Sequence, residues 1–358
     1  MGGINLLVDL SIVIVSWNVK ELLERCLAAL AADSLGEGGG PVPADGPRSE
    51  GLAPRGPRLA CEIIVVDNGS SDGSPDMVRG QFANVRLITS SSNLGFARAN
   101  NTGVAAGTGR YILLLNPDTE VRGGALAAMV TYMDEHPDIG TLGPKLLTPE
   151  ALEERVQPSR RRFPTLATAF LESTMLQQWF PRNRVLQRYY VQDKSDDEEQ
   201  DTDWLVGACL LIRREAWEQV GPLDENMFMY SEELDWCRRA KAAGWRVVYV
   251  PWAKVVHHEA QSSNQVVPAR HIYFQSSKVY YFRKYHGAAA GETLRLFLLG
   301  TYVFQLVVEA AKWAVGHKRP LRQERIAAYM CVLRSGLRVR GEYALTPPSF
   351  QREQGMNA

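Results

Sequence analysis

The sequence lacks several features that would assign it to a common class of protein. Its 40 basic and 40 acidic residues cancel, so no net charge favours nucleic acid as a partner. Its five cysteines form no CxxC pair, which argues against a disulfide scaffold or a cysteine-rich zinc site and favours a reducing cytosol. The amino terminus has no basic signal-peptide segment, and Asp9 interrupts its apolar run, so we expect it to lead into a strand.

Two nucleotide-binding motifs are also absent. No predicted strand is followed by G-x-G-x-x-G, and G-x-x-x-x-G-K-[ST] does not occur, so a dinucleotide-binding fold and a P-loop NTPase lose support. The irregular glycine cluster at 36–40 replaces neither motif. Residues 36–58 are rich in glycine and proline and predict a mobile insertion, because they cannot bury enough apolar surface to offset the entropy lost on ordering.

The chain instead contains uncharged, β-branched runs separated by helical patterns. Uncharged runs at 11–18 and 111–115 predict strands buried on both faces, and the mainly apolar runs at 61–66 and 85–88, which include Glu62 and Arg86, predict two more strands. Further strands are expected at 139–142, 204–213 and 247–250. Alternation with helices is typical of an α/β fold, a doubly wound and mostly parallel sheet flanked by helices. The length of 358 residues suggests about two domains.

The strand predicted at 111–115 stops at Asn116-Pro117-Asp118. Because Pro117 cannot donate to a sheet, Asp118 is expected just beyond the carboxyl end of a central strand, where open α/β sheets bind their ligands. Taken alone, Asp118 is better explained as a turn residue or as the cap of a helix predicted from about Val121 to His136.

Polar residues follow two other predicted strands. Asp67 opens a loop rich in serine, aspartate and glycine, and its carboxylate suits a base or ribose, although turn chemistry and capping by Ser74 explain the loop equally well. Asn93 and Arg98 lie at the start of the next helix, where a diphosphate can bind. The alternative is that Asn93 caps this helix and Arg98 is a solvated charge.

Acidic residues open a helix predicted at 231–243. The helix dipole stabilises Glu232, Glu233 and Asp235 in a first turn, which explains them without any function. A carboxylate at this position, beside an apolar segment, is also well placed as a general base. His257 follows a predicted strand and is a candidate metal ligand.

Taken together, these segments resemble family 2 glycosyltransferases of the GT-A fold, especially the rhamnosyltransferase-like members. The matching pieces occur in family order, at 11–18, 65–74 (VVDNGSSDGS), 92–103 (SNLGFARANNTG), 111–120 (YILLLNPDTE) and 204–258. The resemblance implies inverting, metal-dependent transfer of a sugar, such as the deoxyhexose rhamnose, from a nucleotide-diphosphate sugar. The implied acceptor is a saccharide or a lipid-linked saccharide of cell-surface polysaccharide biosynthesis, and the implied cofactor is Mg²⁺ or Mn²⁺.

The resemblance also implies roles at the donor site. Asp67 corresponds to the family's nucleobase-binding Asp, and Asn116-Pro117-Asp118 occupies the DxD position with Asn in first place. Asp118 would contact metal and diphosphate, and His257 corresponds to a metal-coordinating His, although the residues after it depart from the family's glycine-rich segment. The donor-binding candidates are Ser16, Asn18, Asp67, Asn93, Arg98 and Asn116.

Glu233 falls where the family's Glu-Asp motif places its base, which is usually an Asp. Glutamate keeps the chemistry and lengthens the reach, so Glu232 and Asp235 remain rivals. Two other classes stay open at this point. One is a sugar-nucleotide-binding protein without catalysis; the other is a nucleotidyltransferase, although no glycine- and lysine-rich triphosphate loop occurs near residue 20.

The carboxyl-terminal part is predicted to be helical. We expect a GT-A domain at 1–265, a helical region at 266–345 and a disordered tail at 346–358. An apolar stretch at 296–315 is followed by basic residues, which favours peripheral attachment of a cytoplasmic protein to the anionic inner face of the membrane. A helical hairpin packed on the domain or on a second subunit explains the pattern equally well. No feature sets an oligomeric state.

Overall fold

The computed structural model describes residues 8–35, 59–149, 155–174, 183–258 and 267–338. The predicted insertion at 36–58 and the predicted tail at 346–358 lie outside these residues. The chain divides into two compact units. The first comprises Met1–Glu225 and Glu232–Gln265, and the second comprises Asn226–Ser231 and Val266–Ala358.

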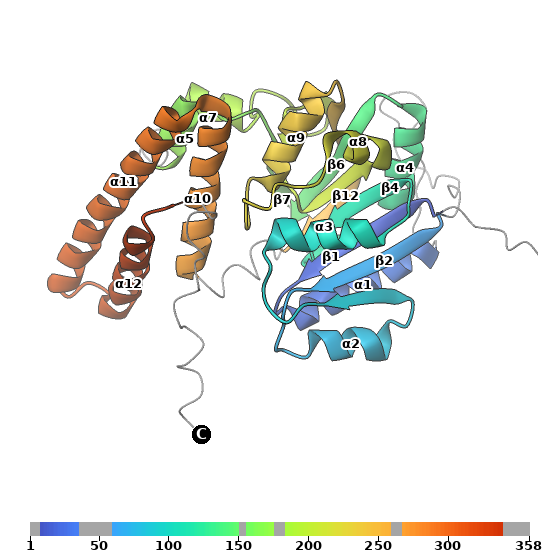
Figure 1. The fold of residues 1–358 in the computed structure, drawn as a ribbon, viewed down its shortest axis with the longest axis horizontal. Coiled ribbons are helices and arrows are strands. Elements are labelled where there is room, and N and C mark those ends of the chain that lie inside the picture. The colour runs from blue at the N-terminus through green and yellow to red at the C-terminus, as the bar shows by residue number, and fades with distance from the viewer. Residues whose placement is uncertain (1–7, 36–58, 150–154, 175–182, 259–266, 339–358) are drawn as a thin grey trace, which may run out of the picture. The chain divides into compact units, whose positions relative to one another are not determined.

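The first unit is a sheet with helices on both of its faces (Figure 1). Its strands are β1 (Leu10–Ser16), β2 (Cys61–Asp67), β3 (Val85–Thr89), β4 (Tyr111–Leu115), β5 (Thr119–Val121), β6 (Ile139–Thr148), β7 (Arg155–Gln157), β8 (Arg160–Arg161), β9 (Gln200–Asp201), β10 (Trp204–Leu205), β11 (Cys209–Arg213) and β12 (Arg246–His257). Its helices are α1 (Lys20–Leu35), α2 (Ser74–Gln81), α3 (Phe96–Ala106), α4 (Ala125–Glu135), α5 (Leu166–Glu172), α7 (Arg184–Tyr189), α8 (Arg214–Val220) and α9 (Glu232–Ala242).

The main sheet runs in the order β3-β2-β1-β4-β11-β6-β12-β5, with β7 on β6 and β9 on β12, while β8 and β10 form a separate pair. Strands β1, β2 and β4 are parallel neighbours, with Ser16 opposite Asp67 and Ile14 opposite Leu115. Their carboxyl ends therefore meet at one edge of the sheet, which is the ligand-binding edge of such folds. The predicted α/β architecture is confirmed.

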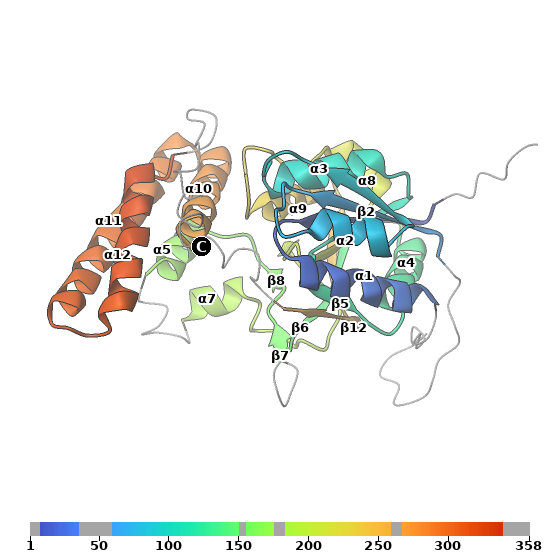
Figure 2. The ribbon, with the colours of Figure 1, turned by 90° about the horizontal axis from the view of Figure 1, so that it is seen from below.

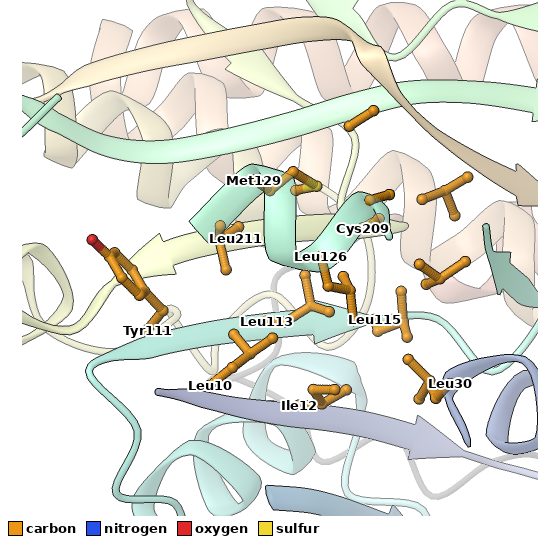
Figure 3. Packing of buried hydrophobic residues seen from close by; sticks show 14 of the residues in the cluster. Leu10, Ile12, Leu30, Tyr111, Leu113, Leu115, Leu126, Met129, Cys209 and Leu211 are labelled. Atoms are coloured by element: carbon orange, nitrogen blue, oxygen red, sulfur yellow. The ribbon is translucent and has the colours of Figure 1, made fainter. Parts of the chain in front are cut away.

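Helices cover both faces of the central strands, which explains why these strands contain no polar alternation. Figure 3 shows Leu30 of α1 and Met129 of α4 in the cluster that packs around Ile12 and Leu113. Figure 2 shows α3 on the opposite side of the sheet from α1. Burial of each such side chain contributes roughly 1.5–3 kcal/mol, so this core holds the binding edge in place.

The helix predicted from about Val121 begins later than expected. Val121 instead ends β5, where it pairs with Val255 of β12. Gly123 and Gly124 then adopt φ values of 66° and 73°, and α4 starts only after them. Asp118 is therefore not a helix cap, because a strand and a glycine turn separate it from α4.

The strand predicted at 204–213 is in fact two strands. The chain leaves the β10 pairing at Val206, whose amide donates to the Ser159 carbonyl at 2.8 Å, and re-enters a strand at Cys209. The strand predicted at 247–250 was too short, since β12 continues to His257 with an irregularity after Val250. Both departures matter because they shape the site described below.

Residues 155–162 contain four arginines and residues 193–203 contain seven acids, a composition that predicts two surface loops, and the two segments pair with each other. Arg160 is 2% exposed and pairs with Asp196, and Arg162 pairs with Asp193 at 2.8 Å. Residues 193–199 are exposed, as predicted for a surface loop, whereas Arg160 is buried and belongs to strand β8, so the prediction of a surface loop is wrong for the arginine-rich segment.

Within its described residues, the second unit contains three helices, α10 (Val267–His286), α11 (Ala288–Ala314) and α12 (Arg319–Ser335). Their shared core includes Phe282, Leu298 and Val332, each fully buried. Helix α11 is long enough and apolar enough to cross a membrane, and 22% of its most apolar window is buried. The predicted carboxyl-terminal helices are thus present, and α11 leaves large apolar side chains exposed, namely Leu296, Val303, Phe304 and Val307.

Candidate active site

The edge of the sheet at β1 and β2 presents two buried polar atoms without hydrogen-bond partners. Asp67 is 2% exposed, and its Oδ2 accepts a hydrogen bond from the Ser70 amide at 3.0 Å. Asp67 Oδ1 and the Ser16 hydroxyl oxygen have no partner. An unpaired buried polar atom costs about 1–3 kcal/mol, so two at one strand edge favour a site that a polar ligand completes.

Two asparagines predicted to bind the donor shape the loops at this edge. Asn18 has a φ of 52°. Its backbone amide donates to the Ser70 hydroxyl oxygen, and its side-chain Oδ1 accepts from the Ser71 backbone amide at 2.8 Å. It thereby joins the loop after β1 to the loop after β2. Asn93 accepts from the Asn68 side chain at 2.9 Å. The capping alternative for Asn93 is wrong, because Gly95 occupies the cap position of α3.

Arg98 lies in the first turn of α3 and is largely exposed. Its nearest acidic partner is Glu225, at a long distance of 3.9 Å. An exposed pair of this kind contributes little to stability, so Arg98 keeps its freedom to move. Its role toward a diphosphate stays a prediction.

The turn at Asn116-Pro117-Asp118 is held by backbone contacts on both sides. The Asn116 amide donates to the Ala208 carbonyl at 2.9 Å, and the His258 amide donates to the Asp118 carbonyl at 2.8 Å. Within the turn, the Thr119 hydroxyl donates to the Asn116 carbonyl at 2.7 Å. The side chains of Asn116 and Asp118 therefore project from a rigid frame rather than from a loose loop.

His257 lies beside Asp118 although the two are far apart in the sequence. The antiparallel register of β12 on β5 sets His257 opposite Thr119, the residue after Asp118. Nε2 of His257 is 3.3 Å from Asp118 Oδ1, and both residues are 5% exposed. The structure thus brings together the two residues predicted as metal ligands.

The surroundings of His257 orient its ring. Its Nδ1 donates to Oε1 of Gln157 on β7 at 2.8 Å. Nε2, the other ring nitrogen, faces the Asp118 carboxylate at 3.3 Å, with the Asn116 amide nitrogen 3.4 Å away. A hydrogen bond from one ring nitrogen that leaves the other for a cation is the usual arrangement of a metal-binding histidine.

Asp118 and His257 fit a divalent cation that is shared with a substrate. In the part of the chain that the structure describes, no group of three or more His, Cys, Asp or Glu side chains could hold a metal by itself. Mg²⁺ commonly takes only one or two protein ligands, with phosphate and water completing its shell. The nearby Cys26 is buried, which raises the pKa of its thiol to about 12.

The acidic start of α9 follows a strained turn. Tyr230 and Ser231 have φ values of 71° and 69°, a region that side chains other than glycine rarely adopt. Helix α9 begins directly afterwards with Glu232 and Glu233. Strain of this kind costs about 1–3 kcal/mol per residue and gathers at functional sites.

Glu232 and Glu233 are carboxylates in a dry environment. Glu232 is 4% exposed, and the Oε2 atoms of both residues are buried without hydrogen-bond partners. Burial and the neighbouring charge of Glu233 raise the pKa of Glu232 well above its usual range. Burial also raises the pKa of Glu233, but hydrogen bonds from its own backbone and those of Gly207 and Leu234, with the charge of Arg161, oppose the rise. Of the two, Glu233 is the better stabilised as a carboxylate.

The break between β10 and β11 links this acid pair to the metal residues. A Cβ atom on Gly207 would lie 3.6 Å from the Glu233 side chain, so Glu233 rests on this glycine. The next residue, Ala208, accepts the hydrogen bond from the Asn116 amide. Glu233 and Asn116 therefore contact neighbouring residues of one short segment.

Asp235 has a different environment from the other two acids. It is fully buried and pairs with Arg239 at 2.8 Å. Arg239 in turn donates to the carbonyls of Val220 and Pro222. These contacts anchor α9 to the end of α8, which favours a structural role for Asp235.

Sequence reasoning missed Gln157 and the surroundings of Glu233. Gln157 lies on a three-residue strand, and no local pattern marks it as a partner of His257. Arg161 was noticed only as one of several arginines in a loop. Gly207 carried the one usable signal, since a glycine within an apolar strand pattern indicates a close approach.

Comparison with known proteins identifies the family. The model of a family described as glycosyl transferase family 2 matches residues 11–221. An N-acetylglucosaminyl-diphospho-decaprenol L-rhamnosyltransferase of Mycobacterium tuberculosis is 35% identical over 231 residues, which cover 62% of this chain and 73% of that protein. The rhamnosyltransferase WbbL of Escherichia coli is 28% identical over 205 residues, which cover 55% of this chain and 72% of that protein.

Solved structures support the fold. A mannosyltransferase from Pyrobaculum calidifontis, in complex with GDP-Man and Mn²⁺, aligns with a TM-score of 0.50 at 15% identity over 93% of this chain and 88% of that chain. Its likeness concerns the fold alone. The family model ends before α9, so the acid pair lies beyond the matched range. Because that model covers more than half of the chain, the protein is a glycosyltransferase that belongs to glycosyl transferase family 2.

Proposed function

We propose that this protein transfers a deoxyhexose such as rhamnose, with inversion, from a nucleotide-diphosphate sugar to a saccharide or lipid-linked acceptor in cell-surface polysaccharide biosynthesis. The observation that carries the proposal is one arrangement of three side chains. Asp118 and His257 meet at 3.3 Å, and Glu233 lies on the Gly207–Ala208 segment that bonds to Asn116. The named activities of the bacterial rhamnosyltransferases supply the sugar and the lipid-linked acceptor.

The donor nucleoside binds at the ends of β1 and β2 in this proposal. Asp67 Oδ1 and the Ser16 hydroxyl are buried and have no hydrogen-bond partner. A base or a ribose hydroxyl can therefore form hydrogen bonds with them without breaking any hydrogen bond of the protein. Asn18 and Asn93 fix the loops beside these two atoms through their hydrogen bonds to Ser71 and Asn68. Arg98 and Asn116 lie further toward the diphosphate.

Asp118 and His257 hold a divalent cation, Mg²⁺ or Mn²⁺, when the donor is bound. Such an ion neutralises the charge that grows on the leaving diphosphate. The contribution of the chain is to keep Asp118 and His257 oriented, through the turn contacts and the Gln157 hydrogen bond, before any ligand arrives. Orientation in advance avoids a reorganisation cost during the reaction.

Glu233 is the general base. The acceptor hydroxyl oxygen attacks the anomeric carbon as the bond from that carbon to the diphosphate breaks, and the hydroxyl proton passes to Glu233. The nucleoside diphosphate leaves with the bonding electrons. Burial raises the pKa of both glutamates, and the backbone amides and the charge of Arg161 oppose the rise at Glu233, which favours Glu233 over the deeper Glu232 as the proton acceptor. One base and no enzyme nucleophile give inversion.

The carboxyl-terminal unit binds the anionic inner face of the membrane. The exposed apolar side chains of α11 recur at helical spacing, and Lys312, Trp313, Lys318 and Arg319 lie at the α11–α12 turn. Apolar contact plus basic residues is the usual combination in interfacial helices. This placement suits a lipid-linked acceptor.

The test is transfer itself. Purified protein is incubated with candidate nucleotide sugars and acceptors, with Mn²⁺ or Mg²⁺ and with a chelator. Thermal shift with nucleotides in the presence of each metal first narrows the choice of donor. We expect product of inverted configuration that requires metal. Transfer at full rate in the chelator, or product with retained configuration, contradicts the proposal.

A further inference from the structure

Arg161 is held in a defined orientation beside the acid pair. It lies on β8 directly opposite Trp204 of β10, so the two side chains share one face of the small sheet. Its Nη1 donates to the Pro158 carbonyl at 2.6 Å and to the Arg160 carbonyl at 3.1 Å. The guanidinium stacks over the Tyr190 ring, 4.6 Å from its centroid, and lies 6.0 Å from that of Trp204. These contacts fix the group in place.

Arg161 differs from its two neighbours in having no acidic partner. Arg160 pairs with Asp196, and Arg162 pairs with Asp193. Among the residues that the structure describes, no carboxylate lies within ion-pair distance of Arg161. Its surroundings are nevertheless dry, since burial lowers the pKa of its guanidinium. The charge of Glu172, which accepts a hydrogen bond from the Tyr190 hydroxyl, opposes this shift without forming an ion pair with Arg161. A half-buried cation with no direct ion pair can still bind an anion.

Arg161 lies near Glu233, because its partner Trp204 on β10 is three residues before Gly207, the glycine that the Glu233 side chain contacts. The positive charge of Arg161 lowers the pKa of Glu233, although the two form no ion pair. Tyr189 lies in the same cluster, since the charges of Arg161 and Glu233 both act on its hydroxyl. That hydroxyl makes no hydrogen bond to any other described residue. A cation and a hydroxyl donor therefore adjoin the carboxylate of Glu233.

We propose that Arg161, assisted by the Tyr189 hydroxyl, binds a phosphate of the acceptor. This rests on the function proposed above, in which Glu233 faces the acceptor and Asp118 and His257 hold the donor diphosphate. Arginine recognises phosphate through its planar set of donors. In an acceptor whose sugar is attached to a diphosphate, Arg161 and Tyr189 would bind the phosphate while a hydroxyl of the sugar points to Glu233.

The experiment uses two acceptors with the full-length chain. One is the N-acetylglucosaminyl diphosphate ester of a short alkyl chain, and the other is the alkyl N-acetylglucosaminide without phosphate. Arg161→Gln should raise KM for the ester about tenfold to a hundredfold, because one charge-assisted contact is lost. It should leave KM for the neutral acceptor and for the donor unchanged. Tyr189→Phe should have a smaller effect on the same KM, and Arg162→Gln is the matched control.

Calorimetry of the ester with metal-free protein measures binding without turnover. We expect Arg161→Gln to weaken this binding and Arg161→Lys, which keeps the charge, to restore part of it. Equal affinity of wild type and Arg161→Gln, or no affinity in wild type, overturns the proposal. So does a variant whose kcat falls on both acceptors at unchanged KM while the acidic limb of its pH profile moves to higher pH, since Arg161 would then act only on Glu233. Failure of the proposed function differs from all of these, because wild-type protein would then transfer no sugar to either acceptor.

Discussion

The donor edge of the sheet and the start of α9 place acidic groups in opposite environments. At the donor edge, Asp67 Oδ2 accepts a backbone hydrogen bond, and His257 is oriented by Gln157. At the start of α9, Glu232 is buried and Glu233 is half-buried; like Asp67, each has an oxygen without a hydrogen-bond partner, but here burial raises the pKa of both carboxyls. The first region is organised to hold charge, and the second makes charge costly.

This difference separates binding from proton transfer. Groups that bind a diphosphate need a fixed orientation and a fixed charge, whereas a general base works best when its pKa is raised toward the working pH. Substitutions in the two regions should therefore change different measured quantities. The predictions that follow use this separation, beginning with the largest expected effect.

Asp118→Ala should reduce transfer to an undetectable rate and abolish metal-dependent nucleotide binding. The reason is the loss of one of only two protein donors at the metal position, Asp118 and His257. Nucleotide titrations with and without Mn²⁺ measure the binding. Asp138→Ala, which removes an exposed carboxylate paired with Arg246, is the control and should behave as wild type. A folded Asp118→Ala protein that binds nucleotide with unchanged dependence on metal would remove Asp118 from the site.

Asp67→Ala should weaken nucleotide binding about tenfold to a hundredfold and keep the requirement for metal. Asp67 Oδ1 is buried and unpaired, and a hydrogen bond to a charged group contributes about 1.5–3 kcal/mol. Calorimetry with the nucleoside diphosphate and with inorganic pyrophosphate separates the contribution of the nucleoside to the affinity from that of the phosphates. Only the nucleoside diphosphate should bind more weakly; equal losses for both ligands would place Asp67 near the phosphates instead.

Val303→Asp combined with Phe304→Asp should weaken binding to anionic liposomes about tenfold or more. Both side chains are at least half exposed on α11, with 50% and 57% of their surface accessible. An aspartate on the exposed apolar face of α11 removes the favourable free energy of burying apolar surface in the membrane, and its negative charge is repelled by anionic lipid. Gln323→Asp adds the same kind of charge at an exposed polar position and serves as control. Unchanged liposome binding by the double variant, or none by wild type, argues against membrane attachment through this face.

Glu232→Gln should raise the melting temperature at pH 7 by about 2–4 °C, the shift that ~1 kcal/mol produces in a domain of this size. The folded-state pKa of Glu232 is raised, so wild type loses stability as pH rises from the ordinary carboxyl value through the raised one. Below the ordinary value the carboxyl is protonated in both states, and the gain should vanish. Melting curves from pH 4 to pH 8 measure this; a gain that is independent of pH would mean that the charge of Glu232 is not its source.

Much of the donor edge could be predicted from local patterns. The strand ends before Asp67 and Asn116 are marked by uncharged runs that stop at turn residues, and parallel pairing then brings them together. The closeness of Asp118 and His257 could be expected only through the family resemblance. It depends on the register of β12 on β5, a short strand that was not predicted and whose last residue, Val121, was expected to open a helix.

The environment of the acid pair could not be predicted from the sequence. Three acids in a first helical turn look equivalent, because capping and dipole effects apply to all of them. Tertiary contacts distinguish them: Arg239 pairs with Asp235, Gly207 underlies Glu233, and Glu232 turns into the interior. Arg161 could not be distinguished from Arg160 and Arg162 in the sequence for the same reason. In the structure, Arg160 and Arg162 form ion pairs with acids that are distant in the sequence, whereas Arg161 forms none.

The central claim is that binding resides at the donor edge while Glu233 takes the proton. Its most direct test is turnover and donor affinity of Glu233→Gln, measured beside Glu232→Gln and Asp235→Asn. Glutamine keeps the size of Glu233 and cannot accept the proton, so we expect a loss in kcat of about a hundredfold or more at near-normal donor affinity. The wild-type rate should also fall on acidification through a pKa above the ordinary carboxyl range, in the direction that burial shifts Glu233. Near-wild-type turnover of Glu233→Gln would contradict the claim; an inactive Glu232→Gln or Asp235→Asn beside it would move the base to that neighbour.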